Sequence, residues 1–115
     1  MELSQRQCAP RRGGVPPLKG DALEVLLQEL QNGWKMINEH HLQKDYVFPS
    51  YQEAFRFTNL IANLAESEGH HPELILSFCN VRVSYWTHKI DGLVESDFIM
   101  AAKSDPIHAN EFPAT

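Results

Sequence analysis

The sequence predicts an α+β fold, a two-layer sandwich in which a four-stranded, mainly antiparallel sheet carries three helices on one face. Three patterns indicate this architecture. Apolar residues recur at helical spacing after residue 21 and again after residue 50, and a pair of segments with alternating apolar residues follows each helical stretch. The predicted order is therefore helix, two strands, helix, two strands, helix. At 115 residues the chain has room for one domain.

The first helix is predicted to begin at Asp21, because Asp21 and Glu24 have the spacing of an acidic capping box. Leucines then follow at positions 23, 26, 27 and 30, and Gly33 ends the helix. From Trp34 to Phe48 the period falls toward two. This change predicts two strands that turn near residues 39–41.

The second helix carries the strongest signals in the chain. Ser50 and Glu53 repeat the capping spacing, and an apolar stripe runs from Ala54 to Ala65 before Gly69. Residues 74–78 and 81–87 then alternate as a second pair of strands. A last helix is predicted from about Glu95 to Lys103.

Three regions follow from this organisation. Residues 1–20 are predicted to form a flexible basic arm, dispensable for folding, because they are rich in proline, glycine and arginine and lack apolar periodicity. Residues 21–105 form the domain, and residues 106–115 form a loose polar tail. The whole chain has a net charge of -5, and its acidic excess lies in the domain. We therefore expect no direct binding of nucleic acid.

Several other classes lack sequence support. No apolar run reaches the length of a membrane span, and the N-terminus lacks the apolar core of a secretory signal, so a cytoplasmic protein without membrane contact is expected. Cys8 and Cys79 are expected to be free thiols. No glycine-rich phosphate loop, paired-cysteine metal motif or nucleophile elbow is present.

Histidine is the residue type that suggests chemistry. Of six histidines, His70, His71 and His88 fall at breaks between elements, where imidazoles can both give and take protons near neutral pH. Two alternatives stay open: favourable cations at a helix end, and a three-histidine zinc site. Zinc is disfavoured because adjacent residues diverge on a helix or a strand. Solvent exposure explains the remaining three, at positions 40, 41 and 108.

The spacing of these residues resembles a known signature. Glu66, His70-His71-Pro72, Phe78, Thr87-His88, Gly92-Leu93 and Asp97 together resemble the signature of the pterin-4a-carbinolamine dehydratases, over roughly residues 21–105. Two positions depart from it. Leu74 replaces a tryptophan common in relatives, and Val94 replaces the Ser or Thr that usually begins the last helix, so Ser96 is expected to cap a shorter helix.

The resemblance implies a reaction and a set of roles. The family eliminates water from 4a-hydroxytetrahydropterin to give quinonoid dihydropterin, with no cofactor and no metal. It implies catalytic roles for His70, His71 and His88, with proton transfer by the first and last and pterin contact chiefly from His71. Substrate-binding roles are implied for Glu66, Pro72, Phe78, Thr87 and Asp97.

The family also implies partners. Its members form homodimers or homotetramers, so a homo-oligomer with a small pterin substrate is expected. One animal branch also acts as a dimerisation partner of a homeodomain activator. The alternative function is therefore a non-catalytic partner-binding protein on the same fold.

Overall fold

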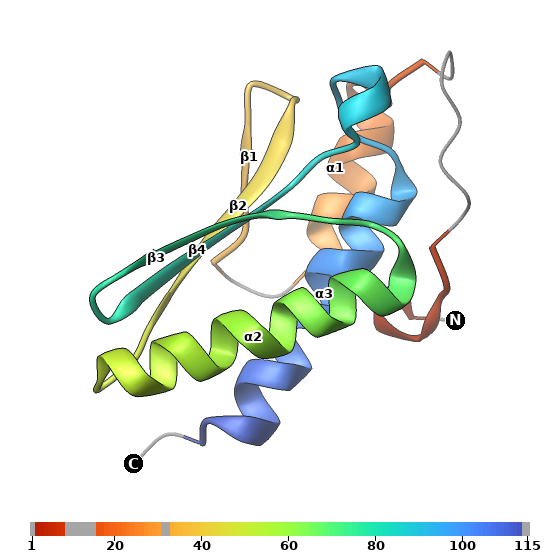
Figure 1. Cartoon of the computed structure of the whole chain (residues 1–115). Coiled ribbons are helices and arrows are strands. Elements are labelled where there is room, and N and C mark those ends of the chain that lie inside the picture. The colour runs from red at the N-terminus through yellow and green to blue at the C-terminus, as the bar shows by residue number, and fades with distance from the viewer. Residues whose placement is uncertain (1, 9–15, 31–32, 114–115) are drawn as a thin grey trace.

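The computed structural model describes residues 2–8, 16–30 and 33–113. Three α-helices and four strands make up its main elements (Figure 1). In chain order they are α1 (Asp21–Gln28), β1 (Lys35–Ile37), β2 (His41–Val47), α2 (Tyr51–Glu68), β3 (Glu73–Ser77), β4 (Asn80–Tyr85) and α3 (Glu95–Glu111). The predicted α+β class and element order are confirmed.

The four strands form one antiparallel sheet in the order β1-β2-β4-β3. Its central pair is β2 and β4, in which Leu42 lies opposite Tyr85 and Tyr46 opposite Val81. Each outer strand joins its neighbour through a tight hairpin, since Ile37 pairs with His41 and Ser77 with Asn80. In this order β1 and β3 are the edge strands of the sheet.

The core lies between one face of this sheet and the helices α2 and α3 (Figure 1). Alternate residues of the central strands point into it, as the period of two predicted. The matching helix residues follow the predicted stripe of α2 and the buried side of α3. Fully buried members on these strands and helices include Leu42, Val81, Val83, Tyr85, Ala54, Phe57, Ile61, Phe98, Met100 and Ala101.

Helix α2 begins and ends where its sequence signals lie. The Ser50 hydroxyl accepts a hydrogen bond from the Glu53 amide at 3.2 Å, which satisfies one free donor of the first turn. Gly69 ends the helix with φ of 67°, in the left-handed region that glycine adopts without steric cost. The chain then turns directly into His70.

Helix α3 differs from the prediction at both ends. It begins after Val94 rather than at a Ser96 cap, because the Asp97 carboxylate accepts the Val94 amide at 2.9 Å. It also continues through Pro106 to Glu111, so residues 106–111 are helical and not a loose tail. Phe112 beyond it is only 8% exposed. Packing of this last turn on the core outweighs the helix-breaking tendency of one proline.

An aromatic cluster holds the end of α3. The His108 ring lies 5.0 Å from the Tyr46 ring, 5.5 Å from Phe48 and 5.9 Å from Phe57, measured between centroids. Burial lowers the pKa of His108, and the nearby Lys44 charge adds to this effect. Solvent exposure therefore does not explain this histidine, which packs with the core.

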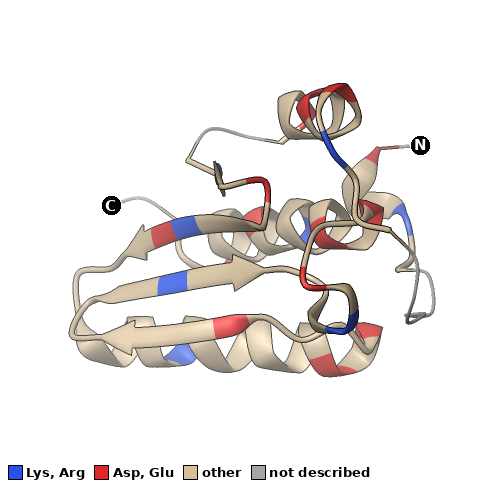
Figure 2. Cartoon of the chain, turned by 90° about the horizontal axis from the view of Figure 1, so that it is seen from above, with Lys and Arg blue, Asp and Glu red and all other residues tan. Residues whose placement is uncertain are grey.

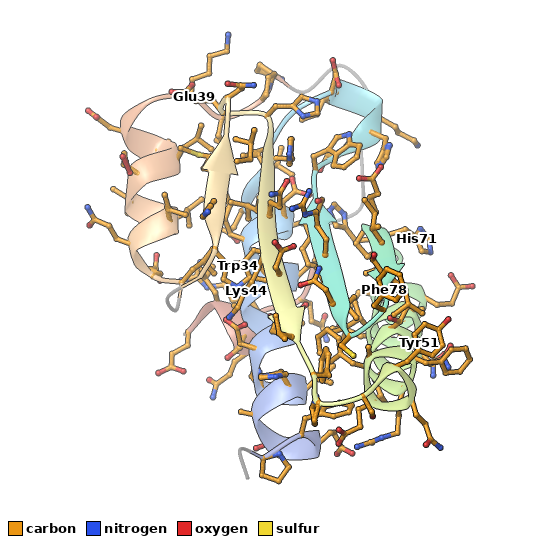
Figure 3. The ribbon with its side chains drawn as sticks, turned by 90° about the vertical axis from the view of Figure 1, so that its left-hand side faces the viewer. Trp34, Glu39, Lys44, Tyr51, His71 and Phe78 are labelled. Atoms are coloured by element: carbon orange, nitrogen blue, oxygen red, sulfur yellow. The ribbon has the colours of Figure 1, made fainter. Side chains whose placement is uncertain are left out.

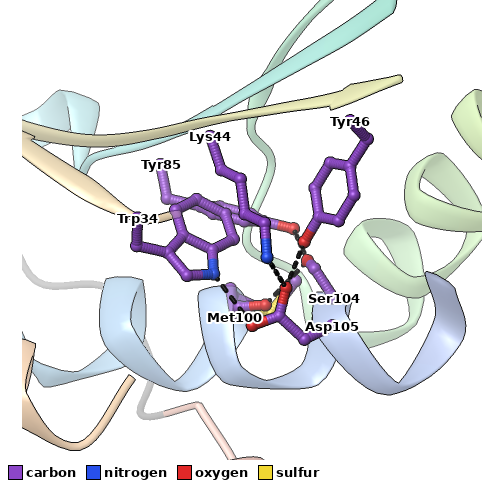
Figure 4. Close-up of polar contacts among 7 residues, drawn as sticks. All are labelled: Trp34, Lys44, Tyr46, Tyr85, Met100, Ser104 and Asp105. Carbon is purple, nitrogen blue, oxygen red and sulfur yellow. Dashed lines mark hydrogen bonds and ion pairs between the residues drawn. The ribbon is translucent and has the colours of Figure 1, made fainter. Parts of the chain in front are cut away.

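A buried carboxylate ties α3 to the inner face of the sheet (Figure 4). Asp105 accepts hydrogen bonds from the Trp34 indole at 3.0 Å, Lys44 Nζ at 2.7 Å and the Tyr46 hydroxyl at 2.5 Å. Its side chain is 7% exposed and that of Lys44 is 17% exposed. The cluster explains how a lysine can share the inward face of β2 with Leu42 and Tyr46.

Residues 2–8 do not form a free arm. Leu3 is 3% exposed and belongs to the core, and the Ser4 carbonyl accepts a hydrogen bond from Lys103 on α3 at 3.0 Å. Arg6 forms an ion pair with Glu95 at 3.3 Å. One apolar side chain and its polar neighbours thus anchor this segment. A single apolar residue shows no periodicity, so the sequence pattern could not reveal this contact. Residues 9–15 of the predicted arm lie outside the described residues.

Cys8 belongs to the same anchored segment. Its amide donates to Glu68 at 3.3 Å, and its sulfur lies 3.8 Å from the Ser96 carbonyl. Burial raises the pKa of the Cys8 thiol to about 11, with a further contribution from the Glu68 charge. Cys8 and Cys79 are both free thiols, as predicted.

Replacing Leu3 with alanine is expected to lower the free energy of unfolding by about 2–3 kcal/mol, because the change leaves a cavity in the core. Denaturant unfolding measures this loss. Gln7→Ala, an exposed change in the same segment, should stay within about 0.5 kcal/mol of the wild type. A Leu3→Ala protein as stable as Gln7→Ala would show instead that the segment is dispensable, as the composition predicted.

Candidate functional site

Two connections meet at one end of the sheet and bring the predicted residues together. Residues 69–72 lead from α2 into β3, and residues 86–94 lead from β4 into α3. Because β3 and β4 are antiparallel neighbours, with Glu73 opposite Ser84, the start of one strand lies beside the end of the other. His70 and Thr87 thereby come close although 17 positions separate them in the chain.

Asp97 is the centre of a buried hydrogen-bond network at this end. Its Oδ1 lies 2.6 Å from His70 Nε2, and its Oδ2 accepts from the Thr87 hydroxyl and from the Val94 amide, each at 2.9 Å. Asp97 is fully buried, and His70 and Thr87 are 1% and 2% exposed. One carboxylate on the first turn of α3 therefore joins the connection after α2, the connection after β4 and the start of its own helix.

This network leaves His70 Nδ1 without a hydrogen bond among the described residues. Because a carboxylate accepts, His70 Nε2 carries the proton of that hydrogen bond, and in the neutral ring Nδ1 then holds a lone pair. Nδ1 is buried and has no hydrogen-bond partner among the described residues. Asp97 thus fixes the ring's orientation and tautomer and can stabilise an imidazolium formed when Nδ1 takes a proton.

His71 points away from its neighbour. Its Nε2 lies 2.8 Å from Glu66 Oε1, and the two side chains are 52% and 81% exposed. Figure 3 shows His71 at the margin of the molecule. His70 is buried while His71 is exposed, so these two adjacent side chains diverge. Pro72 follows immediately and leads into β3.

His88 is exposed and lies next to Thr87 in the chain. Its imidazole stacks on the Trp86 indole, with ring centroids 4.4 Å apart and an angle of 28° between the planes. The His40 and His41 rings also lie close to this indole, with centroids 5.5 and 5.7 Å from that of Trp86. None of these three residues was predicted to belong to the site, although the alternation that runs through β4 places Trp86 on the outer face.

His40 and His41 are only partly exposed, so solvent exposure does not account for them. Their Nδ1 atoms are 3.0 Å apart, and His40 Nε2 lies 2.7 Å from Asp91 Oδ1. Burial lowers the pKa of His41, and the neighbouring His40 charge adds to this effect. These contacts join the β1–β2 hairpin to the connection that carries His88.

Phe78 is separate from the other predicted residues. It lies at the β3–β4 turn, and β3 has five residues between it and Pro72, about 17 Å of extended chain. Phe78 is 84% exposed and has φ of 54°. The structure therefore places Glu66, His70, His71, Pro72, Thr87, His88 and Asp97 at one end of the sheet and Phe78 at the opposite end.

The described residues were also compared with the requirements of a metal site, a basic surface and a membrane-spanning helix. Among them, no group of three histidine, cysteine or acidic side chains could hold a metal ion. Lys and Arg are scattered over several elements, with acidic residues between them (Figure 2). Within the same residues, no helix has the length and apolar character needed to cross a bilayer.

Comparison with known proteins finds one family. The family model described as "Pterin 4 alpha carbinolamine dehydratase" matches residues 16–107. Two similar proteins, from Rickettsia bellii and Alkaliphilus metalliredigens, both carry the name "Putative pterin-4-alpha-carbinolamine dehydratase". They are 52% and 47% identical over 103 residues, which is 90% of this chain and 91% and 93% of theirs.

A solved structure shares the fold. It is titled "Crystal structure of transcriptional coactivator/pterin dehydratase from Brucella Melitensis" and aligns with a TM-score of 0.73 at 29% sequence identity. The alignment covers 79% of this chain and 97% of that one. The matched family region, residues 16–107, contains every residue of the hydrogen-bonded site described above.

Proposed function

Because the chain belongs to the pterin-4-alpha-carbinolamine dehydratase family, we propose that it removes water from 4a-hydroxytetrahydropterin to give quinonoid dihydropterin. This dehydration would recycle the pterin cofactor of aromatic amino acid hydroxylases. The observation that carries the proposal is the buried His70–Asp97–Thr87 network, in which His70 Nδ1 has no partner among the described residues. A buried, oriented imidazole with a free nitrogen is suited to accept a proton.

The reaction needs one proton delivered and one removed. Protonation of the 4a-hydroxyl lets the carbon–oxygen bond break and water leave, while the lone pair of the adjacent nitrogen forms the new carbon–nitrogen double bond. A proton then leaves the heterocycle. We assign delivery to the exposed His88 and removal to His70 Nδ1, so that Asp97 faces the imidazolium produced.

The remaining residues would hold the substrate. His71, hydrogen-bonded to Glu66 at the surface, can contact the flat pterin ring. Pro72 restricts the backbone conformation of His71 and so helps to keep its side chain apart from that of His70. Thr87 holds Asp97 from the strand side. Because His70 Nδ1 has almost no accessible surface in the free chain, substrate contact with it requires the covering side chains to shift.

A direct assay tests this function. Purified protein is added to freshly generated carbinolamine, and formation of quinonoid dihydropterin is followed by absorbance. We expect the rate to rise in proportion to protein concentration above the uncatalysed rate. A rate that stays at the uncatalysed value would contradict the proposal and favour the partner-binding alternative, which the coactivator title of the Brucella structure also suggests.

Dehydration is expected to be independent of metal. The proposed proton transfers use only imidazoles and a carboxylate, and adjacent histidines that diverge cannot share one ion. Protein treated with a chelator and then desalted should keep its full rate. Stoichiometric zinc whose removal abolishes turnover, and whose return restores it, would refute this mechanism.

We also propose that the chain forms a homodimer or homotetramer. Two kinds of exposed surface support this. The β3 edge has one free side and presents Ile75 at 46% exposure. Val47 pairs with Asn80 at the end of the sheet that carries Phe78, and it is 72% exposed. Tyr51, at the start of α2, is 55% exposed (Figure 3). Apolar residues at an open sheet edge favour association between copies.

Light scattering after size-exclusion chromatography tests the association. The wild type should elute with two or four times the chain mass, and Ile75→Lys or Phe78→Ser should shift it toward the monomer. Val25→Ser is the matched control, because Val25 is 61% exposed on α1. A wild type that stays monomeric at high concentration would contradict the proposal.

A further inference from the structure

We propose that Trp86 is a positioning residue of this site, which holds the His88 imidazole in the orientation needed for proton delivery and is itself supported by the β1–β2 hairpin. The inference rests on the proposed function, since it concerns the histidine assigned to deliver the proton. It adds three side chains to the site: Trp86, which positions His88, and His40 and His41, which support Trp86.

The His88 and Trp86 rings are in direct contact. The His88 and Trp86 centroids are 4.4 Å apart with the planes nearly parallel, a stacked arrangement. The His88 side chain makes no hydrogen bond or ion pair with a described residue. An exposed side chain without such a partner is free to change rotamer, so the indole face is the contact that restrains this ring.

Trp86 is in turn contacted by side chains of the β1–β2 hairpin. Leu42 pairs with Tyr85, and continuing this antiparallel register by one position places His41 beside Trp86 on the outer face. The measured ring distance of 5.7 Å agrees with this placement. His40 packs at 5.5 Å and also binds Asp91, three residues after His88. The hairpin therefore restrains both the indole and the connection that carries His88.

The orientation of the His88 ring affects the rate of proton delivery. An acid delivers its proton efficiently only when its nitrogen lies within hydrogen-bond reach of the leaving oxygen. A ring that samples several rotamers spends less time in that position. Loss of the stack should therefore lower kcat more than it raises KM, since His88 acts on the bound substrate.

A double-mutant cycle tests this. Trp86→Ala should lower kcat about 2- to 10-fold, the range that one aromatic pair supports, and Trp86→Phe should keep most of the rate. In a His88→Ala background, Trp86→Ala should cause no further loss. Arg82→Ala is the control, because Arg82 lies on the same face of β4 and contacts Asp45, away from the site. Its kcat should equal that of the wild type.

Two outcomes would overturn the inference. One is an unchanged kcat in Trp86→Ala; the other is a loss of equal size with and without His88, which would show that Trp86 acts by another route. NMR separates this failure from failure of the proposed function. The indole should shift the His88 ring protons upfield, and Trp86→Ala should abolish that shift whether or not the protein is an active dehydratase.

Discussion

Replacing both proton-transfer histidines is expected to leave a folded protein with almost no dehydratase activity. Each single change should lower kcat by about 10²- to 10⁴-fold, the usual effect of losing a general acid or base. Uncatalysed dehydration and the remaining imidazole can soften the single losses, so the double variant is the stronger test. Steady-state kinetics on His70→Gln, His88→Ala and their combination measure these effects.

The choice of glutamine at position 70 follows from the structure. Alanine would leave buried Asp97 without one of its donors and open a cavity, so a loss of activity could reflect unfolding. Glutamine can donate to Asp97 but cannot take up a proton. Circular dichroism checks the fold, and Lys89→Ala, an exposed change beside His88, is the kinetic control.

His71→Ala provides an internal contrast. Its exposed pair with Glu66 suits contact with the pterin ring, so KM should rise more than kcat falls. Near-normal activity in the folded His70→Gln/His88→Ala protein would refute the catalytic assignment. That result would favour the partner-binding alternative.

The largest expected effect on stability is at Asp105. Asp105→Ala should lower the free energy of unfolding by about 3–5 kcal/mol, because it leaves the charge of Lys44 and the donors of Trp34 and Tyr46 without their acceptor (Figure 4). Asp105→Asn should cost less, since its amide oxygen can still accept. Denaturant unfolding at one fixed protein concentration measures both variants.

A surface ion pair serves as the control for Asp105. Asp45 contacts Arg82 at 2.9 Å with both side chains more than 40% exposed, so Asp45→Ala should cost less than about 1 kcal/mol. If Asp105→Ala costs no more than Asp45→Ala, the buried cluster does not stabilise α3 against the sheet. The lysine on the inner face would then lack an energetic explanation.

Most of the fold could be predicted because its signals are local. Ser50 and Glu53 mark the start of α2, Gly69 marks its end, and alternation in residues 81–85 places the side chains of β4 correctly. The end of α3 could not be predicted in this way. Proline at 106 is a local signal for termination, whereas the contacts of His108 and Phe112 that extend the helix come from distant segments.

The features of the candidate site also fall into those set by local sequence and those set by contacts between distant segments. Sequence by itself determined the element order, the family and the residue types present, since helical and strand periods and the spacing from Glu66 to Asp97 are properties of the chain alone. Only the tertiary structure decided that His70 is buried against Asp97 while His71 faces outward, that Phe78 lies apart, and that Trp86 joins His88 to His40 and His41. The physical reason is that these relations depend on strand pairing and burial, which bring together side chains that no local spacing relates.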